Sequence, residues 1–222
     1  MFDLPRFTDR DDAGRRLAAA VRRRYAQAPH PIVLALPRGG VPVAAHIAQE
    51  LRAPLDVCVV RKLGVPGHEE LAMGAIASGG ARVLNPEVIT QLDVSADDIA
   101  DMVAKEEVEL RRRESAYRGT RRLPELSGRT VIVVDDGAAT GASMRVAVQA
   151  LRQLGPRAIV VALPVASRDA VRMLSAVADD CVCLFEPEPF YGVGAWYRDF
   201  SQLVDNDVRE LLLAQERRLA VG

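Results

Sequence analysis

The stretch Val131–Ser143, VIVVDDGAATGAS, decides the fold of this 222-residue chain. Its first four residues are β-branched, which predicts a central parallel strand with both faces covered. Asp135 and Asp136 follow at the carboxyl end, the edge of an open α/β sheet where ligands bind. After the small-residue turn Gly137–Gly141, a helix beginning near Ala142 would direct free backbone N–H groups at the turn. The stretch therefore predicts a site for a phosphate beside ribose hydroxyls, with an ordinary strand-to-helix turn as the alternative.

Segments on both sides of this stretch alternate between strands and helices. The expected strands are Ile32–Leu36, Leu55–Val60, Ala158–Leu163 and Cys181–Phe185. The expected helices are Thr8–Gln27, Val41–Leu51, about Ala142–Leu154, about Ser167–Ala178 and about Val204–Ala220. Such alternation predicts an α/β fold with a mostly parallel, twisted sheet flanked by helices. No repeat or linker divides the chain, so we expect one domain over residues 1–222.

The middle of the chain departs from this alternation. Arg61–Glu70 has glycines, a proline and no apolar period, which predicts a loop. Strand-like runs on either side of Gly79-Gly80 predict a hairpin. Ser95 begins a capping-box pattern, which predicts a long polar helix ending at about Tyr117. The sequence thus predicts a helical insertion at about residues 87–124.

Composition narrows the classes of function. Lys plus Arg is 29 and Asp plus Glu is 30, a net charge of −1 that argues against general nucleic-acid binding. No apolar run reaches membrane-spanning length, and the N-terminal segment is too acidic for a signal peptide, so we expect a cytoplasmic protein without membrane contact. Cys58, Cys181 and Cys183 do not have the spacing of a zinc site.

The residues from Asp135 to Ser143 resemble the signature of the type I phosphoribosyltransferases. In that family two acids follow a hydrophobic strand, then come three small or apolar residues, Thr-Gly and a further Ser or Thr. The resemblance implies that Asp135 and Asp136 hold the 2′- and 3′-hydroxyls of 5-phosphoribosyl 1-diphosphate (PRPP). It implies a 5′-phosphate loop made of Gly137, Ala138, Ala139, Thr140, Gly141, Ala142 and Ser143. Gly137 and Ala138 depart from the family, which often has larger aliphatic residues there, and this departure predicts a more mobile loop.

A second stretch, Leu34–Pro42 (LALPRGGVP), resembles the family's pyrophosphate loop. The resemblance implies that Arg38, Gly39 and Gly40 bind diphosphate, because glycines allow backbone amides to turn toward an anion. The family often has a cis peptide here, which we expect at Pro37-Arg38 or Arg38-Gly39. A tight strand-to-helix turn is the alternative interpretation.

Two cations, Arg61 and Lys62, follow the second predicted strand. They would neutralise the diphosphate leaving group, Lys62 as a point charge and Arg61 as a fork. The resemblance implies a mobile lid, for which Arg61–Glu70 is the candidate and the insertion at 87–124 the alternative. Otherwise the two cations mark an exposed strand end, and His68 is interpreted as a solvated histidine.

Two further segments remain ambiguous. An arginine-rich run over residues 111–122 interleaves with glutamates, which is typical of a salt-bridged helix surface; alternatively, Tyr117 and Arg118 contribute to a substrate pocket. The segment EPEPFYGVGAWYRDF, residues 186–200, concentrates aromatic residues and by resemblance forms a hood over the acceptor, with or without the N-terminal segment. Within it we expect acceptor contacts from Phe190 and Tyr191. Trp196 and Phe200 fit a small aromatic core better.

The resemblance covers a core of about residues 30–185. It implies a transferase that moves the phosphoribosyl group of PRPP to a small nitrogen acceptor, a nucleobase, and releases diphosphate. The catalytic residues would be Asp135, Asp136, Lys62 and Arg61. Mg²⁺ would be the cofactor, carried by PRPP and reached by the two aspartates through water. The alternative is a non-catalytic PRPP-binding regulator or sensor, and a homodimer is expected only from general frequency.

Overall fold

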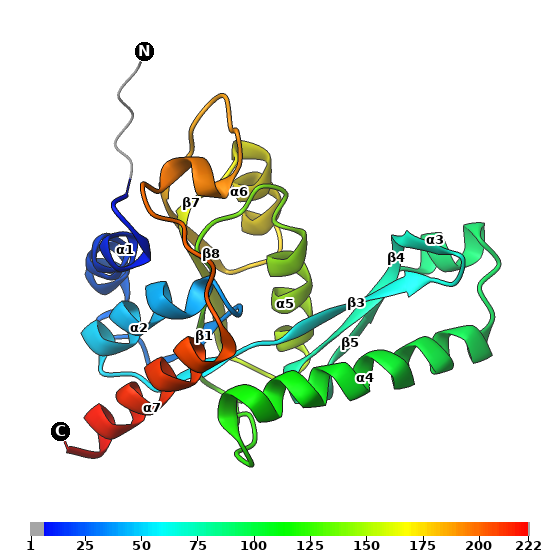
Figure 1. The fold of residues 1–222 in the computed structure, drawn as a ribbon, viewed down its shortest axis with the longest axis horizontal. Helices are drawn as coiled ribbons and strands as arrows, with labels where there is room; N and C mark the ends of the chain where they lie inside the picture. Colours follow the sequence, from blue (N-terminus) through cyan, green and yellow to red (C-terminus); the bar gives the residue numbers. More distant parts are fainter. Residues whose placement is uncertain (1–6, 222) are drawn as a thin grey trace.

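Five parallel strands form the main sheet of the computed structural model, which describes residues 7–221 (Figure 1). The strand order is β2-β1-β6-β7-β8. Their bounds are β1 Ile32–Ala35, β2 Leu55–Val57, β6 Thr130–Val134, β7 Ala158–Val165 and β8 Asp180–Phe185. All neighbours run parallel, and Val33 of β1 lies beside Ile132 of β6. The predicted α/β fold is confirmed.

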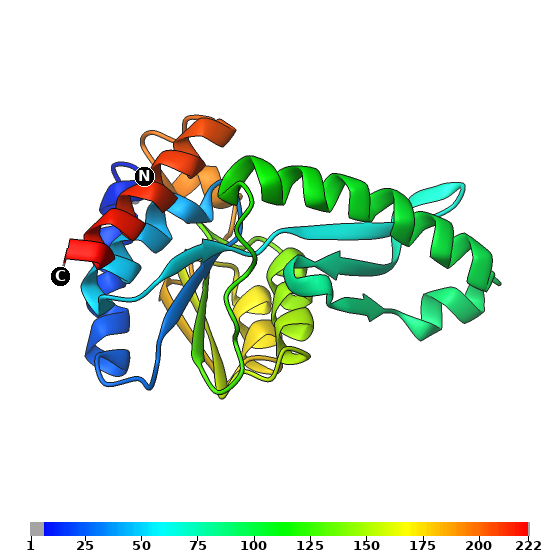
Figure 2. The same ribbon diagram turned by 90° about the horizontal axis from the view of Figure 1, so that it is seen from below.

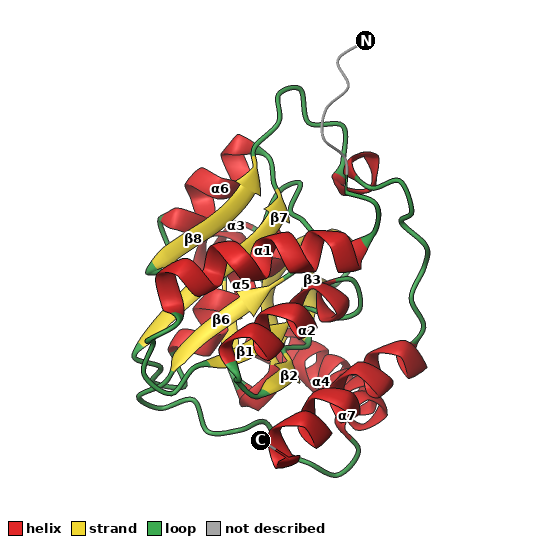
Figure 3. Ribbon diagram, turned by 90° about the vertical axis from the view of Figure 1, so that its left-hand side faces the viewer, coloured by secondary structure: helices red, strands yellow, loops and turns green. Residues whose placement is uncertain are grey.

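Helices cover both faces of this sheet (Figure 3). One face carries α1 Arg10–Tyr25, α2 Gly40–Leu51 and α7 Asp205–Val221; the other carries α5 Ala142–Arg152 and α6 Arg168–Ser175. Side chains of β6 alternate between the two layers: Ile132 and Val134 pack with α1 and α2, whereas Val131 and Val133 pack with α5. All four are fully buried, because each face of the strand is covered.

A second, antiparallel sheet projects from the body as an arm (Figures 1 and 2). It contains β3 Val60–Val65, β4 His68–Ala77 and β5 Arg82–Leu84, in the order β3-β4-β5. Short α3, Pro86–Gln91, leads into α4, Ala96–Arg118, which runs along the arm and back to the body. The predicted hairpin at Gly79-Gly80 and the capping box at Ser95 are both confirmed.

The prediction of a loop at Arg61–Glu70 is wrong, because this segment forms the β3–β4 hairpin. Its strand pattern is concealed by register shifts on both sides of Gly64. A Cβ on Gly64 would lie 3.0 Å from the Glu69 carbonyl oxygen, so the glycine serves the close approach of two strands. Gly67, at φ 76°, makes the turn.

The second predicted strand also ends earlier than expected, at Val57. Arg118, at the end of α4, donates from Nη2 to the Val57 carbonyl (2.6 Å) and from Nε to Asp56 Oδ1 (3.0 Å). Both charged side chains are buried, and burial raises the pKa of Asp56 while Arg118 opposes that rise. This buried pair fastens the arm to the main sheet.

The aromatic segment after β8 packs on the N-terminal part of the chain. Phe7 forms a β-bridge with Tyr197, and both lie in a small core with Trp196 and Val165. The predicted aromatic core is therefore present at Trp196. The first six residues of the acidic N-terminal segment lie outside the described part of the structure.

Two expectations concern cysteines and membranes. The three cysteines are free, and Cys58 is buried. Across residues 7–221, none of the helices combines the length and the apolar character needed to cross a bilayer.

Candidate active site

The turn after β1 packs against the carboxyl end of β6. Its Pro37-Arg38 peptide is cis, one of the two positions expected. A Cβ on Gly40 would lie 2.5 Å from the Val134 carbonyl oxygen, so a side chain there would clash with the β6 backbone. The two sequence motifs, far apart in the chain, thus meet at one edge of the sheet.

Asp135 and Asp136 lie at this junction as expected. The Asp136 backbone N–H donates to Asp135 Oδ1 (2.8 Å), and Tyr197 Oη donates to the Asp136 carbonyl (2.5 Å). Burial, followed by the neighbouring Asp136 charge, raises the pKa of Asp135 well above its usual range. Burial also raises the pKa of Asp136, although Arg10 acts against that rise. Two adjacent acids are thereby held at the site at the cost of removing them from water.

Arg10 is a site residue that the sequence did not reveal. Its Nε donates to Asp136 Oδ2 at 2.8 Å, and both side chains are largely buried. The guanidinium lies 3.9 Å from the Phe200 ring centroid, and Nη1 donates to the Ser201 carbonyl (2.8 Å). Arg10 thus fixes the orientation of one acid. Since 126 positions separate it from Asp136, no local pattern could have identified it.

The predicted 5′-phosphate loop is tethered at its start and open at its end. The Ala138 N–H donates to the Val165 carbonyl (3.0 Å), and a Cβ on Gly137 would lie 2.6 Å from Val193 Cγ1. These contacts hold the part of the loop where the sequence predicted mobility. The four exposed residues of the loop are Ala139, Thr140, Ala142 and Ser143. They surround the start of α5, where helix geometry leaves backbone N–H groups free.

Two cavities meet at Arg38. The first, of about 330 Å³, is lined by Arg10, Arg38, Gly39, Asp136, Phe200, Gln202 and Leu203. The second, of about 290 Å³, is lined by Pro37, Arg38, Arg112, Arg113, Tyr117 and Asp205. Tyr117 therefore lines a cavity at the predicted diphosphate loop, whereas Arg118 is buried against Asp56 and lies outside both linings.

The remaining arginines of α4 form ion pairs on its surface. Arg111 pairs with Glu107, and both Arg112 and Arg113 pair with Glu109. The interpretation of this run as a salt-bridged helix surface is therefore confirmed for these three residues.

Arg61 and Lys62 are not brought to either cavity. Both lie on β3 of the arm: Arg61 Nη2 pairs with Glu106 of α4 (2.6 Å), and Lys62 Nζ donates to the Glu70 carbonyl (3.1 Å). His68 is exposed at the start of β4. We expected these two cations to lie beside the diphosphate because they were predicted to be on a loop. The segment forms the β3–β4 hairpin instead.

The aromatic residues of the predicted hood do not lie where we expected them. Tyr191 is 79% exposed, and Phe190 packs against the Trp196 cluster; neither lines the two cavities. Phe200 lines the cavity beside Asp136 while it also contacts Tyr197, with ring centroids 5.0 Å apart. Phe200, expected to be only a core residue, is therefore the one of these three that shares a cavity lining with Asp136.

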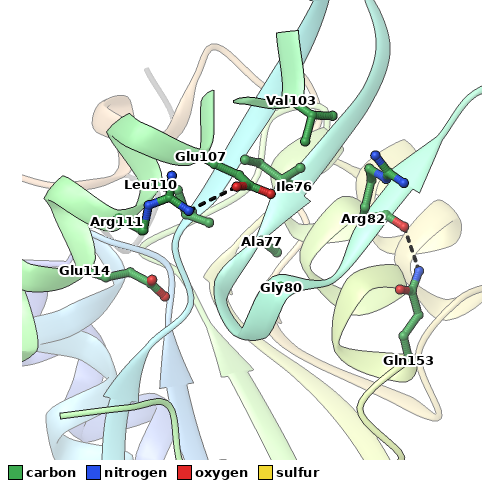
Figure 4. Close-up of a pocket in the computed structure, with 10 residues that line it drawn as sticks. All are labelled: Ile76, Ala77, Gly80, Arg82, Val103, Glu107, Leu110, Arg111, Glu114 and Gln153. Carbon is green, nitrogen blue, oxygen red and sulfur yellow. Dashed lines mark hydrogen bonds and ion pairs between the residues drawn. The ribbon is translucent and has the colours of Figure 1, made fainter. Parts of the chain in front are cut away.

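A further cavity of about 600 Å³ lies under the arm, between β4, α4 and α5 (Figure 4). Glu107 and Arg111 of α4 pair at its edge, and Gln153, which follows α5, donates to the Arg82 carbonyl. None of the predicted site residues lines it.

The donor set available to a metal is small. Within residues 7–221, His, Cys, Asp and Glu side chains do not gather in threes in a way that could hold a metal ion. Asp135 and Asp136 offer two carboxylates only. This set fits a Mg²⁺ ion that keeps most of its ligands from water and a phosphorylated substrate, not an all-protein site.

The phosphoribosyl transferase domain family matches residues 8–192. Two Mycobacterium tuberculosis proteins, from strains CDC 1551 and H37Rv, are provisionally named phosphoribosyl transferases and are each 46% identical over 217 residues. The match covers 96% of this chain and 48% of each relative, so the chain spans about half the length of these curated relatives.

The crystal structure of the protein TT1426 from Thermus thermophilus is similar over nearly the whole chain. The two share 44% sequence identity with a TM-score of 0.84, over 95% of this chain and 99% of that one. The arm therefore belongs to a fold that an experimental structure shares. Family match, relatives and fold together show that this chain belongs to the phosphoribosyltransferase family, which the sequence resemblance predicted.

Proposed function

We propose that this chain transfers the 5-phosphoribosyl group of PRPP to a small nitrogen acceptor, a nucleobase, and releases diphosphate. The observation that carries the proposal is the junction of Asp135 and Asp136 with the glycine turn after β1 and the open loop before α5. Carboxylates suit ribose hydroxyls, and free amides beside a helix start suit a phosphate. Family membership supports the same activity.

The chemistry is a displacement at C1′ of the ribose. The bond from C1′ to the diphosphate oxygen breaks and that oxygen takes the electron pair. The acceptor nitrogen forms the new bond to C1′ and releases its proton to solvent. Charge develops on an oxocarbenium-like sugar, as in glycoside cleavage. We assign Asp135 and Asp136 to the ribose, the exposed loop residues to the 5′-phosphate, and the turn at Arg38 to the diphosphate. Rigid holding of the substrate can supply several kcal/mol of the barrier reduction.

Mg²⁺ is the proposed cofactor. It would neutralise charge on the diphosphate oxygens, and Asp135 and Asp136 are the residues that would hold it, through water. Arg10 would keep Asp136 ionised and correctly turned for that contact, since its guanidinium lies 2.8 Å from the carboxylate.

The acceptor side is assigned to the hood. Phe190, Tyr191 and Phe200 offer planar faces that suit a nucleobase, and Tyr191 is the most exposed of the three.

A PRPP sensor without catalysis is the second candidate. It is favoured by one observation: the segment expected to be a mobile lid is a paired hairpin whose two cations are already bonded to Glu106 and Glu70. A lid excludes water from the reaction, and a sensor does not need one.

The deciding experiment measures diphosphate release from PRPP and Mg²⁺ across a panel of purines, pyrimidines and amines, with a parallel measurement of PRPP binding by calorimetry. Release that depends on one acceptor establishes the transferase and identifies its substrate. Saturable PRPP binding without release for any acceptor supports the sensor. Absence of PRPP binding overturns both. The matched control is the Asp135→Asn, Asp136→Asn double variant, which we expect to bind no PRPP.

A further inference from the structure

Three arginines and one aspartate line the second cavity at Arg38, and two of the arginines come from the arm. Arg112 and Arg113 of α4 line it together with Arg38, Tyr117 and Asp205. We propose that this cavity holds the diphosphate of PRPP, so that α4 supplies the cations that bind the leaving group. The inference rests on the proposed PRPP site and extends it to residues of the arm.

The position of Arg38 supports this assignment. Arg38 lines both cavities, one of which contains Asp136 while the other contains Arg112 and Arg113. The groups of PRPP have a matching arrangement. The ribose hydroxyls lie on one side of the C1′–O bond, and the negatively charged diphosphate lies on the other. A substrate with its ribose at Asp136 can therefore extend past Arg38 into the cationic cavity.

The walls of the cavity are held by residues from three separate elements. Asp205, the first residue of α7, accepts from Tyr117 Oη (3.1 Å) and lies 3.5 Å from Arg38 Nη1. This carboxylate joins the turn after β1 to the end of α4. Arg38 and Tyr117, from two separate elements, thus both contact Asp205 in the wall of the cavity.

The two arginines of α4 retain donors for an anion. Arg112 uses Nε and Nη2 on Glu109, and Arg113 uses Nε on the same carboxylate (2.7, 2.9 and 2.8 Å). These hydrogen bonds, those of Arg112 first, lower the pKa of Glu109 to about 2. Arg112 Nη1 and both terminal nitrogens of Arg113 have no hydrogen-bond partner among the described residues. Glu109 therefore orients two guanidinium groups, whose remaining N–H groups can donate to phosphate oxygens.

Arg61 and Lys62, the cations that the sequence indicated for diphosphate binding, lie elsewhere. Arg61 pairs with Glu106, Lys62 donates to a backbone carbonyl, and neither lines the cavity. The chain thus has a cationic site at the diphosphate turn, but it comes from residues about 50 positions later than the pair that the sequence indicated.

The test compares three ligands that share different parts of PRPP. Calorimetry with Mg²⁺ would measure PRPP, inorganic diphosphate and ribose 5-phosphate against the full chain and the Arg112→Gln, Arg113→Gln double variant. We expect PRPP and diphosphate to bind on the order of 100-fold more weakly, since each charge-assisted contact contributes about tenfold. Ribose 5-phosphate lacks the diphosphate and should bind unchanged.

The matched control is Arg111→Gln, which removes one charge from the neighbouring position of the same helix, outside this cavity. It should change none of the three affinities. Equal weakening of diphosphate binding by Arg111→Gln and by the double variant would show a general charge effect and overturn the inference. Unchanged PRPP binding in the double variant would overturn it while leaving the proposed function intact. A parent chain that binds neither PRPP nor ribose 5-phosphate would instead reject the proposed function, and the inference with it.

Discussion

The carboxylate of Asp136 occupies the space that a side chain at position 39 would fill. A Cβ built on Gly39 would overlap Asp136 Oδ2 and lie 2.5 Å from its Cγ. The glycine turn after β1 and the acids after β6 are therefore fitted to each other atom by atom. A side chain added at position 39 must therefore displace the Asp136 carboxylate.

Replacement of Gly39 by Ala should displace Asp136 and weaken PRPP binding by at least about tenfold. Overpacking of this kind also costs about 1–3 kcal/mol of folding free energy. Asp136→Ala removes the clashing atoms, so the Gly39→Ala, Asp136→Ala pair should be more stable than the sum of the single effects predicts, while PRPP binding stays lost. Urea unfolding of the four proteins and calorimetry with PRPP measure both quantities. Purely additive stabilities would contradict the proposed contact.

Loss of Arg10 should impair Asp136 through its ionisation. Because Arg10 acts to lower the pKa of Asp136 against burial, Arg10→Gln should raise that pKa. PRPP binding should then weaken about tenfold at neutral pH, and the acid limb of its pH profile should move to higher pH. Arg15→Gln, on the exposed side of the same helix, is the control and should leave the profile unchanged. A uniform loss of affinity at every pH would argue for a steric role instead.

Asp135 should lower the stability of the fold at neutral pH. Its pKa in the folded state lies above the usual value of 3.8, so the folded protein holds the proton longer than the unfolded chain. Stability must then fall as the pH rises from about 4 through the raised pKa. Asp135→Asn removes this loss, so at pH 7 its Tm should exceed that of the parent by at least about 3–5 °C, the change expected for about 1.4 kcal/mol of recovered stability.

Near pH 4 the two melting temperatures should converge. Thermal melts from pH 4 to pH 8 measure the effect, with exposed Asp101→Asn as the matched control. A variant that melts below its parent at pH 7 would refute the assignment of a buried, destabilising carboxylate.

The buried Arg118–Asp56 pair should contribute strongly to the attachment of the arm. Arg118→Met leaves Asp56 buried without its partner, which typically costs about 3–5 kcal/mol. Adding Asp56→Asn should recover part of that loss, because it removes the uncompensated charge. Arg121→Met, which removes an exposed ion pair with Glu216, should cost less than about 1 kcal/mol. Denaturant unfolding distinguishes the three variants, and similar costs for Arg118→Met and Arg121→Met would exclude this role.

The main sheet and the position of the two acids could be predicted because their signals are local. The apolar run of β6 has no interruption, and two acids and a glycine turn follow it directly. The same holds for β1 and the turn at Arg38. Each of these features depends on a short run of consecutive residues, and the structure keeps them together.

The arm and its ion pairs could not be predicted in this way. Strand β3 has two register shifts around Gly64, which remove the alternation that identifies a strand. The partners of Arg61, Arg10 and Arg38 lie 45, 126 and 167 positions away. Tertiary packing determines whether a cation binds a ligand or pairs with a distant carboxylate. The local sequence around the cation does not indicate which of the two occurs.

The segment between Val193 and Asp205 determines where a fragment of this protein can end. The family match ends at residue 192, yet Phe200 lines the cavity beside Asp136 and Asp205 joins Arg38 to Tyr117. A fragment that stops at the family boundary would keep every signature residue and lose both of these neighbours. Such a fragment would contain the signature motifs, but its measured affinity for substrate would differ from that of the intact chain.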